Sequence, residues 1–263
     1  MAVIGLDIGG TKIKAGVVSN NRILKKLVVK TGKTKKEVIN NILSSVDSLF
    51  DKKITAIGIG CPGPADYNKG LIKNTTNLPL EGVNIKNIIS KRFRKKTLME
   101  NDANCFVLGE SIRLKKKNII GLTLGTGIGG GIVINNKLYK GKGNAGELGH
   151  CTIKFDGLKD KFGKGNLEAY LSSKAIKKRY NKEPSKLSKK DWNDYGKLLG
   201  TGIVNLAHTF DPDIIVIGGG ISKAFNSFKS SMNNAIKKRT KYQFKVIKGY
   251  EDSGILGAAA IVK

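Results

Sequence analysis

Two short segments combine glycines with polar side chains in a pattern suited to binding phosphate. The first segment runs from Gly5 to Val18, and its notable positions are Asp7, Gly9, Gly10, Thr11 and Lys12. The apolar stretch before Asp7 and the β-branched stretch after Lys12 predict two strands joined by a tight turn. Glycines there let backbone N–H groups approach an anion, while Thr11 and Lys12 can reach phosphate oxygens. Asp7, at a strand end, is suited to face a Mg²⁺-bound water.

The alternative for this segment is an ordinary Gly-Gly hairpin with polar neighbours. A second copy favours phosphate binding, because Ile120–Gly127 repeats the pattern of Ile4–Thr11 and its turn holds Gly125, Thr126 and Gly127. This repeat predicts one duplicated ancestral half rather than a short-period solenoid. Two such hairpins, facing each other, would hold a polyphosphate from both sides.

The glycines from Gly125 to Gly130 also match the spacing G-x-G-x-x-G of dinucleotide-binding folds. That fingerprint requires a helix after the glycines, whereas Ile132–Ile134 predicts a strand, so the dinucleotide interpretation is excluded. The chain has no G-x-x-x-x-G-K-[ST] motif, which excludes a P-loop.

Asp102 lies between a predicted short strand at 97–99 and a predicted helix that runs to about Leu114. A carboxylate at a strand end suits a general base that accepts a hydroxyl proton during phosphoryl transfer. Aspartate is also a common helix N-cap, and the residues alone favour that role.

A glycine-framed segment, Gly146–His150, places Glu147 and His150 close together. Carboxylates and imidazoles in such turns can accept hydrogen bonds from sugar hydroxyls. A metal site is the alternative, but the neighbouring residues supply no further ligands. Glu168 either joins this pair or is a solvated helix residue, and His208 is predicted to be a packed or helix-terminal histidine.

The periodicity of apolar residues predicts a mixture of strands and helices in each half of the chain. The first half has predicted strands at 2–6, 13–18, 22–30, 54–60 and 97–99, and helices at 34–51, 84–94 and 102–114. The second half has predicted strands at 119–124, 130–135, 151–155, 214–217 and 244–247, and helices at 191–210, 225–239 and 254–262. The insert at 156–190 is the least regular part. Meanders combined with crossover helices predict α/β layers with both sheet faces covered.

The charge of the chain is unusual, because 48 Lys and Arg residues against 20 Asp and Glu residues give a net charge of +28. Such a field attracts nucleic acid, anionic membranes or anionic substrates. The lysines are scattered in short clusters, and only 6% of the residues are aromatic, which argues against a stacking platform for single strands. A solvated lysine-rich surface is therefore favoured, and a real polyanion contact is the alternative. The high positive charge also allows non-specific attraction of nucleic acid.

The length of 263 residues allows one large domain or two lobes. No apolar run approaches the roughly 18 residues of a membrane span, and the immediate start of the first strand leaves no room for a signal peptide. The three cysteines, Cys61, Cys105 and Cys151, have no paired spacing, which favours a reducing cytoplasm.

These segments together resemble the ROK family (repressors, open reading frames and sugar kinases) of the actin-like ATPase superfamily. The resemblance runs nearly end to end, through Leu6–Lys12, Glu100–Asn104, Gly125–Gly131, Ala145–His150, Asp211–Gly220 and Leu256–Ala260. It implies a duplicated actin-like (ribonuclease H-like) α/β fold with a cleft between two lobes. The lobes are expected at 1–114 and 115–249, with a last helix (about 250–263) that packs back on the first.

The resemblance also implies an ATP- and Mg²⁺-dependent sugar kinase, and many relatives are homodimers. Asp102 is implied as the base on the sugar hydroxyl. The implied sugar-binding residues are Gly63, Asn77, Asn101, Glu147, His150 and Glu168. The implied phosphate and Mg²⁺ residues are Asp7, Gly9, Gly10, Thr11, Lys12, Gly125, Thr126 and Gly127, and the adenosine turn is Gly218, Gly219 and Gly220.

One family feature is missing. Members commonly carry C-x-C-G-x-x-G-C-x-E after the histidine, and these cysteines bind a structural zinc with it. The matching stretch here is one residue shorter, and Asp160, Phe162 and Asn166 stand at the cysteine positions. We therefore predict no structural zinc, with hydrophobic contacts or His150 hydrogen bonds ordering the loop. The segment Thr76–Leu80 also departs from the family's Pro-Asn-Leu-Pro-Trp, which predicts a different wall of the sugar pocket.

The predicted function is a cytoplasmic kinase that transfers the γ-phosphoryl group of ATP to the 6-hydroxyl of glucose. N-acetylmannosamine and N-acetylglucosamine are the alternative sugars. A sugar-responsive regulator, a polyanion-binding protein or a non-catalytic sensor are alternatives of another class. The charge of +28 favours a regulator or polyanion-binding protein, whereas the intact Asp102 and the absence of an N-terminal helix-turn-helix argue against it. The intact phosphate residues argue against a non-catalytic sensor.

Overall fold

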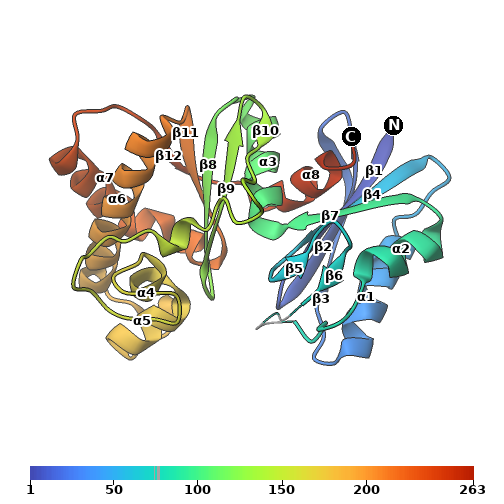
Figure 1. Cartoon of the computed structure of the whole chain (residues 1–263), viewed down its shortest axis with the longest axis horizontal. Coiled ribbons are helices and arrows are strands. Elements are labelled where there is room, and N and C mark those ends of the chain that lie inside the picture. The colour runs from blue at the N-terminus through green and yellow to red at the C-terminus, as the bar shows by residue number, and fades with distance from the viewer. Residues whose placement is uncertain (74, 76–77) are drawn as a thin grey trace. The chain divides into compact units, whose positions relative to one another are not determined.

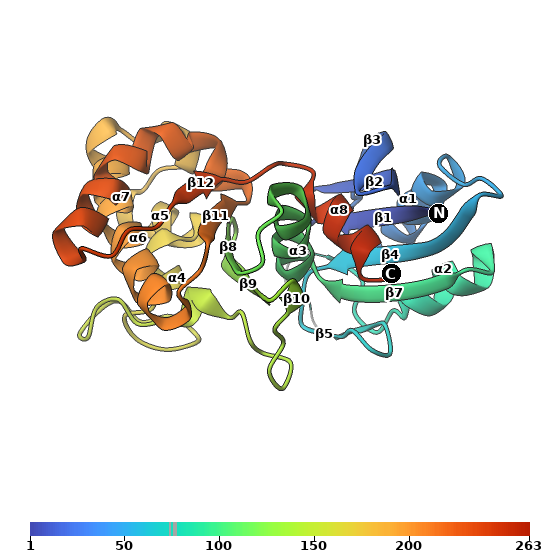
Figure 2. The ribbon, with the colours of Figure 1, turned by 90° about the horizontal axis from the view of Figure 1, so that it is seen from above.

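The computed structural model describes residues 1–73, 75 and 78–263, which form two compact units (Figure 1, Figure 2). The first unit comprises Met1–Lys115 and Asp252–Lys263, and the second comprises Lys116–Glu251. Each unit has its own five-stranded sheet and its own apolar core. Within the described ranges, no helix is both long enough and apolar enough to cross a bilayer.

The sheet of the first unit has the strand order β3-β2-β1-β4-β7. The strands are β1 (Ala2–Ile8), β2 (Lys12–Ser19), β3 (Arg22–Lys30), β4 (Ile54–Cys61) and β7 (Lys96–Asn101). β1, β2 and β3 form an antiparallel meander, whereas β4 and then β7 extend the sheet in parallel to β1. The carboxyl ends of β1, β4 and β7 therefore share one edge, which is where open α/β sheets carry ligand-binding residues. β5 (Ala65–Asp66) and β6 (Leu71–Ile72) form a separate short hairpin.

Helices cover both faces of this sheet. Alternation along β1 points Ile4 and Leu6 into the core beneath α1 (Lys35–Asp47) and α2 (Ile85–Phe93), and Val3 toward α8 (Ser253–Ala260) on the other face. α1 begins at the predicted capping box, in which Thr34 and Glu37 bond each other's backbone N–H groups. α3 (Asp102–Leu114) packs beside α8.

α8 consists mostly of small residues, and its backbone lies close to the backbones of its neighbours. A Cβ built on Gly58 of β4 would lie 1.7 Å from the Ala258 carbonyl oxygen, and one on Gly257 would lie 1.7 Å from the Cys105 carbonyl oxygen of α3. A Cβ on Gly109 of α3 would lie 1.9 Å from the Ser253 carbonyl oxygen. Any side chain at these contacts would overlap main-chain atoms, so glycine is what lets α8 fit between the sheet and α3.

The sheet of the second unit has the order β10-β9-β8-β11-β12. Its strands are β8 (Ile119–Leu124), β9 (Ile128–Ile134), β10 (Lys137–Leu138), β11 (Ile214–Gly218) and β12 (Val246–Lys248). β8, β9 and β10 form an antiparallel meander, and β11 and then β12 extend it in parallel. This arrangement repeats that of the first unit strand by strand, which confirms the predicted duplicated α/β fold.

The helices of the second unit are α4 (Glu168–Leu171), α5 (Ser173–Tyr180), α6 (Lys189–Phe210) and α7 (Phe225–Arg239), with short 3-10 turns at Leu148–His150, Pro184–Lys186 and Gly220–Ala224. α6 and α7 pack closely because a Cβ on Gly196 would lie 2.1 Å from the Ser231 Oγ atom, and one on Gly200 would lie 2.7 Å from the Met232 carbonyl oxygen. Trp192 of α6 contacts the ring of Phe228 of α7 at 5.7 Å between centroids.

The predicted strand at 151–155 is wrong. The segment forms only an isolated bridge between Thr152 and Asn166, and Phe155 is 90% exposed. Its backbone pairs instead with the returning loop, as the Ile153 N–H donates to the Gly165 carbonyl. The alternation of apolar residues there had no sheet edge to join. The insert at 156–190 is also more regular than predicted, because it contains α4 and α5.

Candidate active site

The turn between β1 and β2 presents its tip to solvent. The Gly9 N–H donates to the Lys12 carbonyl at 2.9 Å, which closes the turn, and Gly10, Thr11 and Lys12 are exposed. Buried Thr31 holds the turn from behind, since its hydroxyl donates to the Gly9 carbonyl at 2.6 Å. The predicted phosphate residues therefore stand on a braced turn with their polar groups accessible. The sequence offered no signal for Thr31, which comes from the end of β3.

Asp7 lies just before this turn, on the sheet face that α8 covers. A Cβ built on Gly254, in the first turn of α8, would lie 2.7 Å from the Asp7 carboxyl carbon. Burial raises the pKa of Asp7 above its ordinary value, the negative charge of Asp252 raises it further, and the positive charge of Lys14 opposes both. Asp252 itself is bound by Lys26 at 2.6 Å. Ionised Asp7 is thus held in an unfavourable environment, which a bound cation would relieve.

We expect Asp7→Asn to stabilise the fold at neutral pH while lowering turnover. Because the folded pKa is raised above the unfolded value, the contribution of Asp7 to stability is complete below pH 3.8 and is lost as pH rises through the folded pKa. The neutral amide avoids that loss. The free energy of unfolding of the variant at pH 7 should therefore exceed that of the parent by about 1 kcal/mol, whereas near pH 4 the two should be equal. Thermal melts at both pH values test this.

Asp156→Asn is the control for the Asp7 substitution, because Asp156 is exposed and pairs with exposed Lys164 at 2.8 Å. An equal gain in both variants, or a gain at pH 4 as large as at pH 7, would contradict the assignment.

Asn101 and Asp102 mark the junction of β7 and α3, at the same sheet edge as Asp7. The register places Asp7 beside Gly60 and Gly60 beside Glu100, so the ends of β1 and β7 are about 10 Å apart. The N-cap of α3 is Asn101, whose Oδ1 atom accepts from the Ala103 N–H at 2.9 Å. The cap role that the residues alone favoured for Asp102 is therefore wrong. Asp102 is the first helical residue, where the helix dipole favours an ionised carboxylate.

Tyr67 is a site residue that the sequence did not reveal. The Asn101 Nδ2 atom donates to the Tyr67 hydroxyl oxygen at 3.0 Å, and a Cβ built on Gly63 would lie 2.8 Å from the same oxygen. Burial raises the pKa of Tyr67, so the phenol stays protonated and keeps an O–H to donate. Gly63, Asn101 and Tyr67 therefore meet next to Asp102. Asn77, the remaining predicted residue of this pocket, lies outside the described residues.

We expect Tyr67→Phe to weaken sugar binding more than the chemical step. Phenylalanine keeps the ring but leaves the Asn101 amide without its acceptor, and losing such a bond costs about 1–3 kcal/mol. The KM for sugar should rise about tenfold while kcat changes less than threefold. Steady-state kinetics of the Tyr67 variant measure both values. Tyr139→Phe is the control, because Tyr139 is an exposed tyrosine of the second unit. A fall in kcat at unchanged KM would contradict a sugar-binding role.

The turn between β8 and β9 is the counterpart of the first turn. The Gly125 N–H donates to the Gly127 carbonyl at 2.9 Å, and Thr126 at the tip is exposed. A Cβ on Gly127 would lie 2.7 Å from the Glu168 Oε2 atom, and this atom accepts from the Ile128 N–H at 2.6 Å. Glu168 is therefore neither isolated nor simply solvated, because it braces the second predicted phosphate turn.

Gly218, Gly219 and Gly220 leave the carboxyl end of β11, next to β8. Gly218 pairs with Thr123, and Gly219 has φ +81°. A Cβ on Gly219 would lie 2.3 Å from the Leu124 carbonyl oxygen, whereas one on Gly220 would meet open space. Gly219 is thus required by both its backbone conformation and its close approach to β8, which places the predicted adenosine turn beside the second phosphate turn.

Glu147 and His150 lie on the 3-10 turn that packs against β9. The His150 Nε2 atom is 3.4 Å from the Glu147 Oε2 atom. A Cβ on Gly149 would lie 2.3 Å from the Ile128 carbonyl oxygen. The segment that carries Glu147 and His150 therefore packs against the carbonyl group of Ile128. Glu168 accepts a hydrogen bond from the N–H group of the same residue. The three predicted sugar ligands of the second unit gather at the start of β9.

A sequence model of the ROK family matches residues 3–263 of the chain. The chain belongs to the ROK family. It is 33% identical to a glucokinase of Thermotoga maritima over 100% of this chain and 98% of the relative. It is 32% identical to an N-acetyl-D-glucosamine kinase of Haemophilus influenzae over 98% of each chain.

A crystal structure of a ROK family glucokinase from Streptomyces griseus, in complex with glucose and AMPPNP, matches the fold with a TM-score of 0.82. The identity is 28%, and the match covers 99% of each chain. The protein is therefore a ROK family sugar kinase, similar to glucokinases.

The loop that commonly holds zinc in ROK proteins has a different construction in this chain. The Asp160 Oδ1 atom accepts from the Phe162 N–H at 2.8 Å and from the Asn166 Nδ2 atom at 2.9 Å. The Phe162 ring stacks on His150 with 4.0 Å between ring centroids. The predicted hydrophobic contact is therefore present. The predicted hydrogen bond is not seen for the Nδ1 atom of His150, which is buried and has no partner among the described residues.

These residues do not fit a structural zinc. Such a site needs four N or S ligands around the ion. Here Phe162 offers no donor atom, Asn166 is already engaged, and only the His150 Nδ1 and Asp160 Oδ2 atoms are buried and unpartnered. In the described part of the chain, no group of three or more His, Cys, Asp or Glu side chains is placed to hold a metal.

We expect a strong chelator to leave the melting temperature of this ROK protein unchanged and elemental analysis to find no stoichiometric zinc. Phe162→Ala, by contrast, should lower the stability of the second unit by about 1 kcal/mol, because it removes the ring stack on His150. Phe155→Ala is the control, since that ring is 90% exposed. A chelator-induced drop in melting temperature would contradict the metal-free loop.

Proposed function

We propose that this ROK protein is an ATP-dependent hexose kinase that phosphorylates the 6-hydroxyl of glucose. The observation that carries the proposal is the arrangement at the start of α3. Asn101 supplies the helix cap, so Asp102 is not needed for it and stands at the positive end of the helix. Asn101 and Tyr67 lie beside it as hydrogen-bonding groups for a polar substrate.

In the proposed reaction, the oxygen of the sugar hydroxyl attacks the γ-phosphorus of ATP, and the Asp102 carboxylate accepts the proton of that hydroxyl. The bond between that phosphorus and the β,γ-bridging oxygen breaks, and ADP leaves with the electron pair. In the first unit, Thr11, Lys12 and the backbone N–H groups of the exposed first turn bind phosphate oxygens. In the second unit, the turn around Thr126 offers groups of the same kind. When bound, Mg²⁺ supplies positive charge that offsets the negative charge of the phosphates.

Asp7 is suited to hold that Mg²⁺ together with the phosphates of ATP. Mg²⁺ is commonly bound by one or two carboxylates plus substrate phosphates and waters, so a single carboxylate is enough on the protein side. The burial that raises the pKa of Asp7, with the charge of Asp252 near it, favours a cation at this place. The proposal requires no metal cluster built from protein ligands alone.

Glucose is the proposed sugar because Glu147, His150 and Glu168 are all present and gather at the start of β9. Relatives of similar identity act on different sugars, so kinship alone does not select one of them. N-acetylglucosamine and N-acetylmannosamine are the competing substrates, and they differ from glucose by an N-acetyl group that needs room beside the ring.

We further propose that the protein is a homodimer, which light scattering on the purified chain would test.

A coupled assay of ADP release, with ATP and Mg²⁺, tests the proposal over glucose, mannose, fructose, N-acetylglucosamine and N-acetylmannosamine. We expect glucose to give the highest kcat/KM. A higher value for an N-acetyl sugar would replace the substrate but keep the reaction. If the folded protein bound sugar in calorimetry but released no ADP with any of the five, the kinase function would be refuted and a sensor supported.

A further inference from the structure

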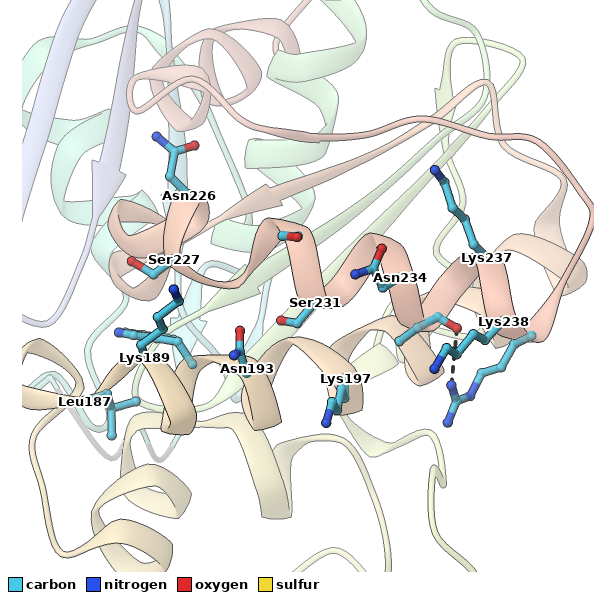
Figure 3. A pocket seen from close by; sticks show the side chains of 14 residues that line it. Leu187, Lys189, Asn193, Lys197, Asn226, Ser227, Ser231, Asn234, Lys237 and Lys238 are labelled. Carbon is cyan, nitrogen blue, oxygen red and sulfur yellow. Dashed lines mark hydrogen bonds between the residues drawn. The ribbon is translucent and has the colours of Figure 1, made fainter.

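A groove runs along the outer side of the second unit between α6 and α7. Its volume is about 1250 Å³. The two helices run in the same direction, because Gly196 contacts Phe228 and Ser231 while Gly200 contacts Met232 and Ala235. Figure 3 shows side chains from both helices along its length, from Asn226 at one end to Lys238 at the other. These two positions on α7 are about 18 Å apart at the rise of an α-helix.

The lining of this groove is cationic and rich in hydrogen-bond donors. Its basic side chains are Lys189, Lys197, Lys237, Lys238 and Arg239, and its neutral donors are Asn193, Asn226, Ser227, Ser230, Ser231 and Asn234. All lining residues belong to the described part of the chain, and none of them is acidic. The groove therefore concentrates positive charge along its whole length, with amides and hydroxyls between the charges.

The acidic side chains of the two helices form ion pairs with residues that do not line the groove. α7 contains no acidic residue, and α6 has only Asp191 and Asp194. Asp191 accepts from Lys182 at 2.9 Å, and Asp194 accepts from Arg179 at 2.6 Å. The four groove lysines form no ion pair with any carboxylate in the described ranges. Their charges are therefore available to an anion from solution.

The shape and chemistry of the groove favour a thin phosphate chain over nucleic acid. A single strand of nucleic acid is usually bound through aromatic side chains that stack on its bases. Trp192 is the aromatic residue of the lining, and it is 7% exposed because it packs on Tyr195 and Phe228. The lining of the groove has no acidic residue to pair with the many lysines of a second copy, so a small polyanion fits this groove better than another copy of the chain does. A single phosphate ion would reach only one end of the groove.

We propose that the groove between α6 and α7 binds linear inorganic polyphosphate, with lysines at both ends and in the middle on successive phosphate groups. This site is separate from the phosphate turns of the proposed kinase reaction, so it is testable whether or not that reaction is confirmed. It also gives a role to part of the high charge of the chain.

The test measures binding of linear polyphosphate to the full chain by calorimetry over a range of salt concentrations. Lys197→Gln with Lys238→Gln removes two charges from the groove. The control, Lys52→Gln with Lys53→Gln, removes two exposed charges from a turn of the first unit and leaves the groove lining unchanged. We expect the groove variant to bind polyphosphate about tenfold more weakly and to lower the slope of log K against log salt by about two, because each lost phosphate contact lowers it by about one. The control should change the affinity less than twofold.

Orthophosphate at the same total phosphate concentration and a single-stranded DNA of similar charge complete the test. The proposal is supported if both orthophosphate and the DNA bind weakly and the groove substitutions lower the affinity for polyphosphate alone. Equal losses in the groove and control variants would show that the overall field of the protein attracts the polymer, and would overturn it. Tighter binding of DNA than of polyphosphate, lost in the groove variant, would replace the proposed ligand with nucleic acid. Circular dichroism confirms that both variants fold.

Discussion

Asp102→Asn should lower kcat by about 10²–10⁴-fold, which is the usual contribution of a general base. The amide has the same shape and keeps an oxygen for the Ala103 N–H, which Asp102 Oδ1 accepts at 2.9 Å. The cap of α3 is untouched, because it belongs to Asn101. The substitution therefore removes a proton acceptor while it keeps the oxygen that accepts from the Ala103 N–H, and the Kd for sugar should change less than threefold.

The measurement combines steady-state kinetics with calorimetry of sugar binding. Asp51→Asn is the matched control, because Asp51 is an exposed aspartate of the same unit whose carboxylate only accepts from a nearby backbone N–H. It should leave kcat and melting temperature unchanged. A kcat within about threefold of the parent in the Asp102 variant would assign the proton to another group. A large loss of melting temperature would show instead that Asp102 is structural.

Gly257→Ala should destabilise the first unit by about 3 kcal/mol or more, a large part of the stability of a typical domain. The added Cβ would lie 1.7 Å from the Cys105 carbonyl oxygen, and a backbone atom cannot turn aside as a flexible side chain does. α8 also lies close against the sheet, since a Cβ built on Gly58 of β4 would lie 1.7 Å from the Ala258 carbonyl oxygen, so little room is left for α8 to move away from α3. The methyl group has no space on either side.

Urea unfolding of Gly257→Ala and of Ala260→Ser measures the effect. Both substitutions add one heavy atom to α8, but Ala260 is partly exposed near the end of the helix. The control should change stability by less than about 0.5 kcal/mol. The glycine variant should also lose turnover, because α8 positions Gly254 against Asp7 and packs on the helix that begins with Asp102. Equal stability of the two variants would contradict the close packing of α8.

The sequence alone predicted the features that depend on neighbouring residues. The repeat of Ile4–Thr11 in Ile120–Gly127 predicted two related hairpins, and both units have the same strand order. The capping box at Thr34 and the apolar period after it predicted α1, because a helix start is a matter of residues three or four apart. The segment at 151–155 failed for the complementary reason, since a strand exists only where another strand can pair with it.

The tertiary structure decided what each polar residue at the proposed site does. Asn101 and Asp102 are both good helix caps by type, and only the backbone geometry of the junction assigned the cap to Asn101. Tyr67 gained a place beside Asn101 through the packing of a loop from a different strand. The cationic groove joins lysines of α6 and α7 that are far apart in the chain. Such pairings arise from packing between distant segments, which no local pattern encodes, whereas the glycine turns and the capping box at Thr34 depend on residues a few positions apart.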